Sequence, residues 1–428
     1  MTITPRRLMR CPVRRFPALL ALGALALSPW SSGTAAAATP PRGSEPPSRS
    51  AVARPVPFTA AVLRVGFSEA KGKTTVQGAD AFLDITLIPA QGEVSGYRRE
   101  VSIQRFNQLL RSFYSELASQ APLKLADASS PSRELYSILF QPVAEKLRQL
   151  GITTLLISAD SGLQAVPFAA LHDGKAFFGE RFGFALTPAL GLTRLALTPQ
   201  TPNAKMLAAG ASQFEGLSPL PLVPQELAQI TQDRPAVRFL NKDFTPQLLL
   251  DQAGLPQVNR VHVATHAEFL PGGPAASRIY TGMGPMSLKQ LAELRRRRGE
   301  AQLDLFVLSA CRTALGDADS ELGFAGLALQ AGARSAMGSL WYVDDVATSA
   351  LFVQFYRYLD RGLTKADALQ LTRQAMASGA MRLVGNQVVN GQGEVLLAGL
   401  TSAEQRRIAA GLQHPFYWAG IQLLGSPW

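Results

Sequence analysis

The sequence predicts an α/β fold in which a mostly parallel β-sheet is flanked by helices. The chain has 428 residues, of which 47% are hydrophobic and 17% charged, a composition typical of globular proteins. Short and almost continuous apolar runs recur along its second part, as expected of strands that are buried on both faces. Amphipathic helical patterns lie between and after these runs, and such alternation favours a parallel sheet. The apolar runs are residues 154–158, 205–209, 260–265, 304–309 and 335–340.

The region before residue 150 predicts two strands followed by two helices. The strands are expected at 60–66 and 81–88, where β-branched and apolar residues gather. Helical spacing of Phe and Leu residues predicts a helix over 102–119 and a second one that begins near Leu135. Pro142 predicts a bend in the second helix and Gly151 its end.

The last hundred residues predict two further helices. The first carries Phe352, Phe355, Tyr356 and Leu359 on one face. The second begins near Thr364, where Asp367 follows at the spacing of a capping arrangement. No sequence repeat of 20–50 residues is visible, which excludes a helical repeat array in this chain.

The N-terminus has the pattern of an export signal. Five arginines lie in the first 15 residues, and an apolar stretch, 16–27, follows them. Small residues at Ala35–Ala38 fit a cleavage site, so we expect a signal peptide at 1–38 and a Pro-rich linker at 39–57. The protein is then periplasmic or secreted, with no membrane contact beyond the signal; an uncleaved anchor is the alternative. The pair Arg14-Arg15 does not decide between general and twin-arginine export.

A cysteine and a histidine are the strongest candidates for chemistry. The chain has 2 cysteines, and loss of Cys11 with the signal leaves Cys311 without a disulfide partner. Cys311 follows the predicted strand 304–309, and His266 follows the predicted strand 260–265. Because ligands gather at the carboxyl ends of strands in such sheets, we expect the two side chains at one edge, where the imidazole can activate the thiol. The alternative is a buried core cysteine.

Several segments resemble the CHAT domain family of bacterial caspase relatives. They are "LYSILFQPVAEKL", "SADSGLQAVPFAALHD", "VHVATHAEF", "LDLFVLSACRTALGD", "ELGFAGLALQAGARSAMGSLWYVDD" and "HPFYWAGIQLLG". The resemblance covers roughly Leu135 to Gly425, with the motifs in the same order. Ala-Cys-Arg with a histidine 45 residues upstream is also close to the caspase arrangement.

This resemblance implies a caspase–hemoglobinase-like fold with a Cys311–His266 dyad. It implies a CHAT domain at 135–428 and a companion subdomain at 58–134. The oxyanion hole would use the backbone N–H groups of Ala267 and Cys311. Many relatives have Gly where Ala267 stands, and Ala tolerates a positive φ less well than Gly does. Many also carry tetratricopeptide repeats that hold partners, so this chain would need a separately encoded regulatory partner, or none.

Residues of a substrate pocket are harder to identify. An acidic pocket would select Arg or Lys before the cut, and Asp160, Trp341 and Asp345 follow predicted strands where they could line it. The acids Asp317, Asp319, Glu321 and Asp344 are further candidates. Each acid could instead cap a helix, Asp345 above all, since a helical pattern starts there.

Other polar residues carry structural interpretations. His262 is expected in the core, and His172 and His414 are expected to be structural or surface residues. With 4 histidines, no zinc site of the usual ligand set is visible, and no cofactor is expected. The basic run Arg295–Arg298 is expected to be a solvated helix end. It carries no interleaved aromatic residues, so a nucleic-acid site is not indicated.

The sequence therefore predicts a caspase-like cysteine endopeptidase that cleaves protein or peptide substrates in a limited way. The alternative is a CHAT-fold interaction or regulatory module that has lost catalysis. A thiol oxidoreductase is disfavoured, because no C-x-x-C motif or resolving cysteine is present.

Overall fold

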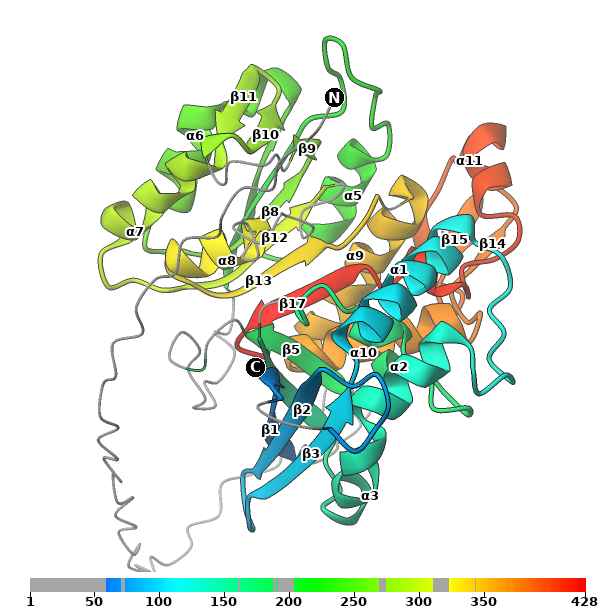
Figure 1. The fold of residues 1–428 in the computed structure, drawn as a ribbon. Coiled ribbons are helices and arrows are strands. Elements are labelled where there is room, and N and C mark those ends of the chain that lie inside the picture. The colour runs from blue at the N-terminus through cyan, green and yellow to red at the C-terminus, as the bar shows by residue number, and fades with distance from the viewer. Residues whose placement is uncertain are drawn as a thin grey trace, which may run out of the picture. The chain divides into compact units, whose positions relative to one another are not determined.

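One sheet of eleven strands organises the described part of the chain (Figure 1). The computed structural model describes residues 59–70, 74–160, 162–187, 190, 204–268, 275–310, 323–342 and 344–428. The predicted signal peptide and linker therefore lie outside the described residues. Everything described belongs to one unit that extends from Pro55 to Trp428.

The sheet has two halves that meet at β17. In sheet order, the first half consists of β3 (Ser95–Val101), β2 (Ala81–Pro89), β1 (Ala60–Glu69), β4 (Thr154–Ala159), β5 (Gly183–Thr187) and β17 (Ile421–Gly425). The second half consists of β13 (Ala333–Ser339), β12 (Leu303–Ser309), β8 (Val258–Ala264), β6 (Lys205–Gly210) and β7 (Ala236–Leu240).

Strand direction reverses between the halves. The five strands of the second half are mutually parallel. Strand β17 pairs antiparallel with β13 but parallel with β5, and β4 and β1 keep the direction of β5. The carboxyl ends of β8 and β12 therefore lie at the opposite edge of the sheet from the carboxyl ends of β4 and β5. Figure 1 shows β17 in red between β5 and β13.

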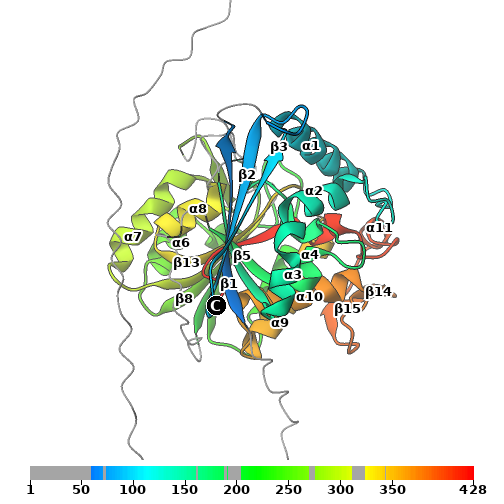
Figure 2. The same ribbon diagram turned by 60° about the horizontal axis from the view of Figure 1, so that its bottom comes forward.

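Helices cover the sheet on two sides, as Figure 2 shows. Buried residues of α1–α5, α9 and α10 share one hydrophobic cluster with the sheet, and those of α6–α8 share a second cluster. The helices are α1 (Ile103–Ser119), α2 (Pro131–Leu139), α3 (Gln141–Gln149), α4 (Phe178–Arg181), α5 (Val223–Ile230), α6 (Pro246–Ala253), α7 (Glu293–Arg298), α8 (Gly323–Gln330), α9 (Asp345–Asp360), α10 (Lys365–Ala377) and α11 (Ser402–Arg407).

Two small sheets and four short 3₁₀ segments complete the described elements. One small sheet is formed by β9 (Ala267–Glu268), β10 (Arg278–Thr281) and β11 (Gly284–Ser287), and the other by β14 (Arg382–Val384), β15 (Gln387–Val389) and β16 (Val395–Leu397). The 3₁₀ segments are η1 (Phe168–Ala170), η3 (Asn241–Asp243), η5 (Leu288–Ala292) and η6 (Pro415–Tyr417).

The α/β class and the mostly parallel sheet are confirmed. All seven predicted strands form, within a few residues of their expected ends. The predicted helix with a bend at Pro142 is instead two helices, α2 and α3, since Pro142 lies in the first turn of α3 and the chain changes direction at Phe140. Strands β1–β3 extend the same sheet, because β1 pairs directly with β4.

Candidate active site

The carboxyl ends of β8 and β12 lie side by side. Ala264 is in register with Ser309, and the backbone N–H of Thr265 donates to the Ser309 carbonyl at 3.1 Å. Alternate residues of both strands enter the two hydrophobic clusters, so both strands are buried on both faces. His266 follows directly. Cys311 lies outside the described residues, which end here at Ala310.

The His266 ring is held by two contacts with the loop that follows β6. Its Nε2 lies 2.8 Å from the carbonyl oxygen of Ser218, and its ring centroid lies 4.6 Å from that of Phe214. A carbonyl oxygen can only accept, so this contact assigns the proton to Nε2. In the neutral ring Nδ1 is then the basic nitrogen.

Ala267 adopts an extended conformation in β9 and pairs with Ile279. Its φ is not positive, so the alanine carries no backbone strain at this position. The carbonyl of His266 accepts the N–H of Tyr280 in β10 at 3.0 Å. In a trans peptide the carbonyl and the next N–H point in opposite directions, so the Ala267 N–H points away from β10.

A small cavity adjoins His266. Its walls come from the residues that follow β8, the end of β12, the loop before α5, α5 and the first turns of α9. The lining residues are Leu220, Leu222, Val223, Glu226, Thr265, His266, Ser309, Ala310, Asp345, Thr348 and Ser349. The hydroxyl of Thr348 is buried and has no hydrogen-bond partner among the described residues. The cavity therefore presents a carboxylate and an unpartnered hydroxyl close to the imidazole.

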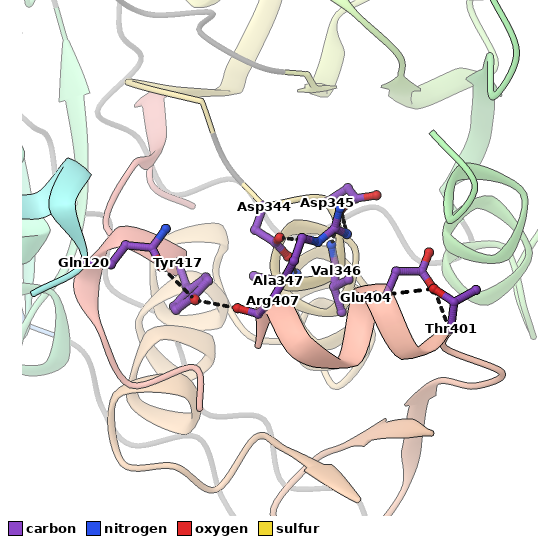
Figure 3. Close-up of polar contacts among 9 residues, drawn as sticks. All are labelled: Gln120, Asp344, Asp345, Val346, Ala347, Thr401, Glu404, Arg407 and Tyr417. Carbon is purple, nitrogen blue, oxygen red and sulfur yellow. Dashed lines mark hydrogen bonds and ion pairs between the residues drawn. The ribbon is translucent and has the colours of Figure 1, made fainter. Parts of the chain in front are cut away.

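Asp345 is held by Arg407 of α11 (Figure 3). The Arg407 guanidinium also forms an ion pair with Asp344, with Nε 3.0 Å from Oδ2. Burial raises the pKa of Asp345, and the charge of Arg407 opposes that rise. The helix cap expected at Asp345 is provided by Asp344, whose side chain accepts the Ala347 N–H at 3.0 Å. Asp345 thus brings its carboxylate to the cavity that His266 lines.

Asp160 does not belong to this site, which corrects the expectation from the sequence. Asp160 follows β4, and β4 runs opposite to β8, so Asp160 lies at the other edge of the sheet. Five strand steps separate β4 from β8, or roughly 24 Å at the usual strand spacing. The expectation needed β4 and β8 to run in the same direction, and β17, which pairs antiparallel with β13, reverses the direction between them.

Trp341 packs away from the cavity. Its Nε1 donates to the Phe416 carbonyl at 3.0 Å, and its ring meets Tyr114 of α1 edge to face at 5.9 Å. A Cβ added at Gly420 would lie 2.7 Å from the indole, so that glycine leaves room for the ring. Trp341 is not among the residues that line the cavity beside His266.

His262 lies in the core, as expected, but with a carboxylate partner that the sequence did not reveal. Its Nε2 lies 2.8 Å from Glu226 Oε1, and the Ser349 hydroxyl donates to Glu226 Oε2 at 2.6 Å. Glu226 and Ser349 line the cavity, so this buried network forms its floor. A Glu on a short helix 36 residues upstream carries no local signal of this pairing.

The basic run at Arg295–Arg298 is not simply a solvated helix end. The Arg298 side chain is buried, and its guanidinium donates to five backbone carbonyls, of Ala253, Leu255, Val258, Ala301 and Gln302. This arginine ties the end of α6 and the start of β8 to the turn before β12.

The described residues contain no cluster of three or more His, Cys, Asp or Glu side chains that would hold a metal ion. Within the same residues, no helix combines the length and the apolar character that crossing a membrane requires. Besides Cys311, the candidate acids Asp317, Asp319 and Glu321 lie outside the described residues.

The profile of the CHAT domain family matches residues 129–426. The chain belongs to the CHAT domain family. The match contains both β8 and β12, and it begins close to α2. The family identified from sequence motifs is thus confirmed. Among curated proteins, none matches this CHAT domain chain.

Solved structures similar to this CHAT domain protein include a separase–securin complex and gingipain structures. For the Saccharomyces cerevisiae separase–securin complex the TM-score is 0.49 at 11% identity, over 86% of this chain and 30% of that chain. For the Arg-specific cysteine proteinase gingipain R the TM-score is 0.40 at 10% identity, over 67% of this chain and 66% of that chain. For the complex of Porphyromonas gingivalis RgpB pro- and mature domains the TM-score is 0.38 at 10% identity, over 76% of this chain and 77% of that chain. This chain spans about 30% of the separase chain.

Proposed function

We propose that this protein is a cysteine endopeptidase that performs limited proteolysis, with Cys311 as nucleophile and His266 as base. The observation that carries the proposal is the register of β8 and β12. Ala264 is level with Ser309, and His266 and Cys311 each come two residues later. If both backbones keep this register, the two side chains leave the same face of the sheet on strands about 4.8 Å apart.

The proposed chemistry follows from the ring contacts of His266. Nε2 is engaged with Ser218, so Nδ1 accepts the thiol proton as the sulfur attacks the scissile carbonyl carbon. The protonated imidazole then donates that proton to the leaving amine, and a thioester remains on Cys311. Water attacks the thioester and releases the acid product and the thiol. General base and acid catalysis of this kind contributes about 10²–10⁴ in rate.

The tetrahedral intermediate needs donors for its oxyanion. The Ala267 N–H is directed away from β10 and is therefore a candidate donor, and the Cys311 N–H is the second in this proposal. Ala267 requires no positive φ, so its difference from the glycine of many relatives is compatible with activity.

Thiol reactivity tests the dyad. An unassisted cysteine has a pKa near 8.5, so only about 3% is thiolate at pH 7. We expect iodoacetamide to alkylate Cys311 with a rate that levels off well below pH 8, and His266→Ala to move this midpoint toward 8.5. Peptide mass mapping separates Cys311 from Cys11. A slow rate that does not respond to His266→Ala would favour a non-catalytic CHAT-fold module.

Cleavage itself is tested with a peptide library and the purified chain. Cys311→Ala is the matched control, because it removes only the sulfur. Cleavage by the wild type and none by Cys311→Ala supports the proposal. Reactive Cys311 without any cleavage would mean that the dyad forms but that a separate partner or an untested substrate is needed.

We also propose that the protein is exported to the periplasm or secreted, since residues 1–38 have the pattern of a signal peptide. Mass measurement of the N-terminus of the protein purified from its own cells tests this. A mature chain that begins near Thr39 supports export, and an intact Met1 in the cytoplasmic fraction contradicts it.

A further inference from the structure

A second and larger cavity lies at the edge of the sheet opposite His266. Its volume is about 830 Å³, within the range of small-molecule sites. It is bounded by the residues that lead into β6 and β7, by Arg260 near the start of β8, and by the last turns of α5 and α9. It shares no lining residue with the cavity beside His266.

Three cations with buried side chains belong to one connected set of ion pairs at this cavity. The side chains of Arg234, Arg260 and Lys365 are only 9%, 6% and 1% exposed. Arg234 and Arg260 share Asp360, and Arg260 and Lys365 share Asp304. Two nitrogens of the Arg234 guanidinium, Nε and Nη1, are buried and have no hydrogen-bond partner among the described residues, and a buried charge is favourable only when it is compensated.

The pKa directions of two of these cations also indicate incomplete compensation. Burial lowers the pKa of Lys365 even though Asp304 lies 2.7 Å away, and the charges of Arg334 and Arg260 add to that lowering. Burial likewise lowers the pKa of Arg234, against the attraction of Asp360. Asp360 therefore offsets the burial of the Arg234 guanidinium only in part, and an anion in the cavity would offset the rest.

Four arginines line the walls of the cavity. Arg234, Arg260, Arg357 and Arg361 line it, against the acids Asp233, Asp360 and Glu394. Arg357 is engaged with Glu394 at 3.3 Å and with the Val395 carbonyl at 2.8 Å. Arg361 is exposed and lies over the Tyr358 ring at 5.6 Å, so it can turn toward a ligand without losing a buried contact.

We propose that this cavity is a binding site for a small molecule that carries a phosphate-type anion with two or more negative charges. Guanidinium groups present paired N–H donors that match phosphate oxygens, and several arginines from separate elements converge here. The site does not depend on the proposed peptidase chemistry, because it lies at the other edge of the sheet.

Calorimetric titration with inorganic pyrophosphate, at constant ionic strength set with chloride, tests the proposal on the purified chain. We expect saturable binding with one site per chain. Citrate serves as a comparator of similar charge that lacks phosphate. Citrate binding as tight as that of pyrophosphate would overturn the phosphate assignment, and no saturation up to about 10 mM pyrophosphate, a very weak affinity, would overturn the site.

Two variants locate the binding. Arg234→Gln removes a deep guanidinium, and Arg361→Gln removes an exposed one, so the second keeps the test valid if the first fails to fold. Each should weaken pyrophosphate binding about tenfold, as expected for a lost charge-assisted hydrogen bond. Arg111→Gln, an equal charge change on the exposed face of α1, should leave binding unchanged. Binding that all three variants retain equally would place the anion elsewhere and overturn the proposal.

Discussion

Glu226 and His262 form a hydrogen-bonded pair inside the protein, with Nε2 and Oε1 2.8 Å apart. Their side chains are 3% and 0% exposed. The second oxygen of Glu226 accepts the Ser349 hydroxyl, and Tyr356 approaches the other ring nitrogen of His262 at 3.4 Å. The pair joins α5, β8 and α9 directly beneath the cavity that His266 lines, so it links core packing to the candidate site.

Removing Glu226 should therefore destabilise the fold strongly. Glu226→Ala leaves His262 Nε2 and the Ser349 hydroxyl buried without their partner, and we expect a loss of about 3–5 kcal/mol in the free energy of unfolding. Glu226→Gln keeps the shape and can still bond both groups, so its loss should be about 1 kcal/mol. Urea unfolding measures both. Equal losses for the two variants would mean that the negative charge of Glu226, which both variants remove, sets the stability, and not the shape and hydrogen bonds that Gln keeps.

We expect two arginines of the basic run Arg295–Arg298 to contribute very differently to the stability of the fold. Its guanidinium satisfies five carbonyls, so Arg298→Ala leaves buried acceptors unpaired, and we expect a loss of about 3–5 kcal/mol. Arg296 is exposed in the same helix, and Arg296→Ala should change stability by less than about 0.5 kcal/mol. Thermal and urea unfolding of the two variants provide the comparison. A similar small effect at both positions would show that water replaces the five bonds.

His414 predicts a pH dependence of stability. Its Nδ1 accepts the Phe416 N–H at 3.1 Å and so caps η6, and burial lowers its pKa below the usual 6.5. A lowered pKa means that the unfolded chain binds the proton more readily. The stabilisation by neutral His414 is therefore complete above pH 6.5 and is lost as the pH falls through the folded pKa.

His414→Asn isolates this contribution. Asn keeps an oxygen acceptor for the Phe416 N–H but does not titrate. Between pH 7.5 and 5, the free energy of unfolding should fall less for the variant than for the wild type, by about 1.4 kcal/mol for each unit of pKa shift. The pKa of His172 is also lowered by burial, so His172→Asn should flatten the profile in the same way. Parallel profiles of variant and wild type would contradict the prediction.

How much of this structure could be predicted from the sequence depended on whether the signal was local. The strands that precede His266 and Cys311 in the sequence are continuous apolar runs, so β8 and β12 were predictable almost to the residue. Strand β17 was not predicted, because Ile421–Gly425 is short and nothing nearby shows that it lies antiparallel to β13. That one insertion moves Asp160 to the far edge of the sheet.

The second limit on prediction from the sequence was the pairing of side chains that lie far apart in the chain. Arg407 lies 62 residues after Asp345, and Glu226 lies 36 residues before His262, so neither partner has a sequence signature. The cap of α9 is a smaller case. Asp344 and Asp345 are adjacent, and only the backbone geometry assigns the cap to Asp344 and the cavity to Asp345.

A prediction at Asp345 rests on the proposed peptidase activity. A carboxylate that lines the cavity beside His266 should attract a basic residue of the substrate, so Asp345→Asn should raise the KM for peptides with Arg or Lys before the cut. A rise of about tenfold corresponds to about 1.4 kcal/mol of binding. Peptides with a neutral residue at that position should be affected much less. Equal effects on both peptide sets would exclude Asp345 as the selecting group.

Arg407 should act in the opposite direction. Its side chain is 46% exposed and pairs with both Asp344 and Asp345, and such exposed ion pairs contribute only about 0.2–1 kcal/mol. Arg407→Ala should therefore cost little stability but leave the carboxylates uncompensated, which lowers the KM for basic peptides. Arg406→Ala is the matched control, since Arg406 is exposed on the same helix. A higher KM in Arg407→Ala would mean that Arg407 holds Asp345 in position and does not compete with the substrate for its charge.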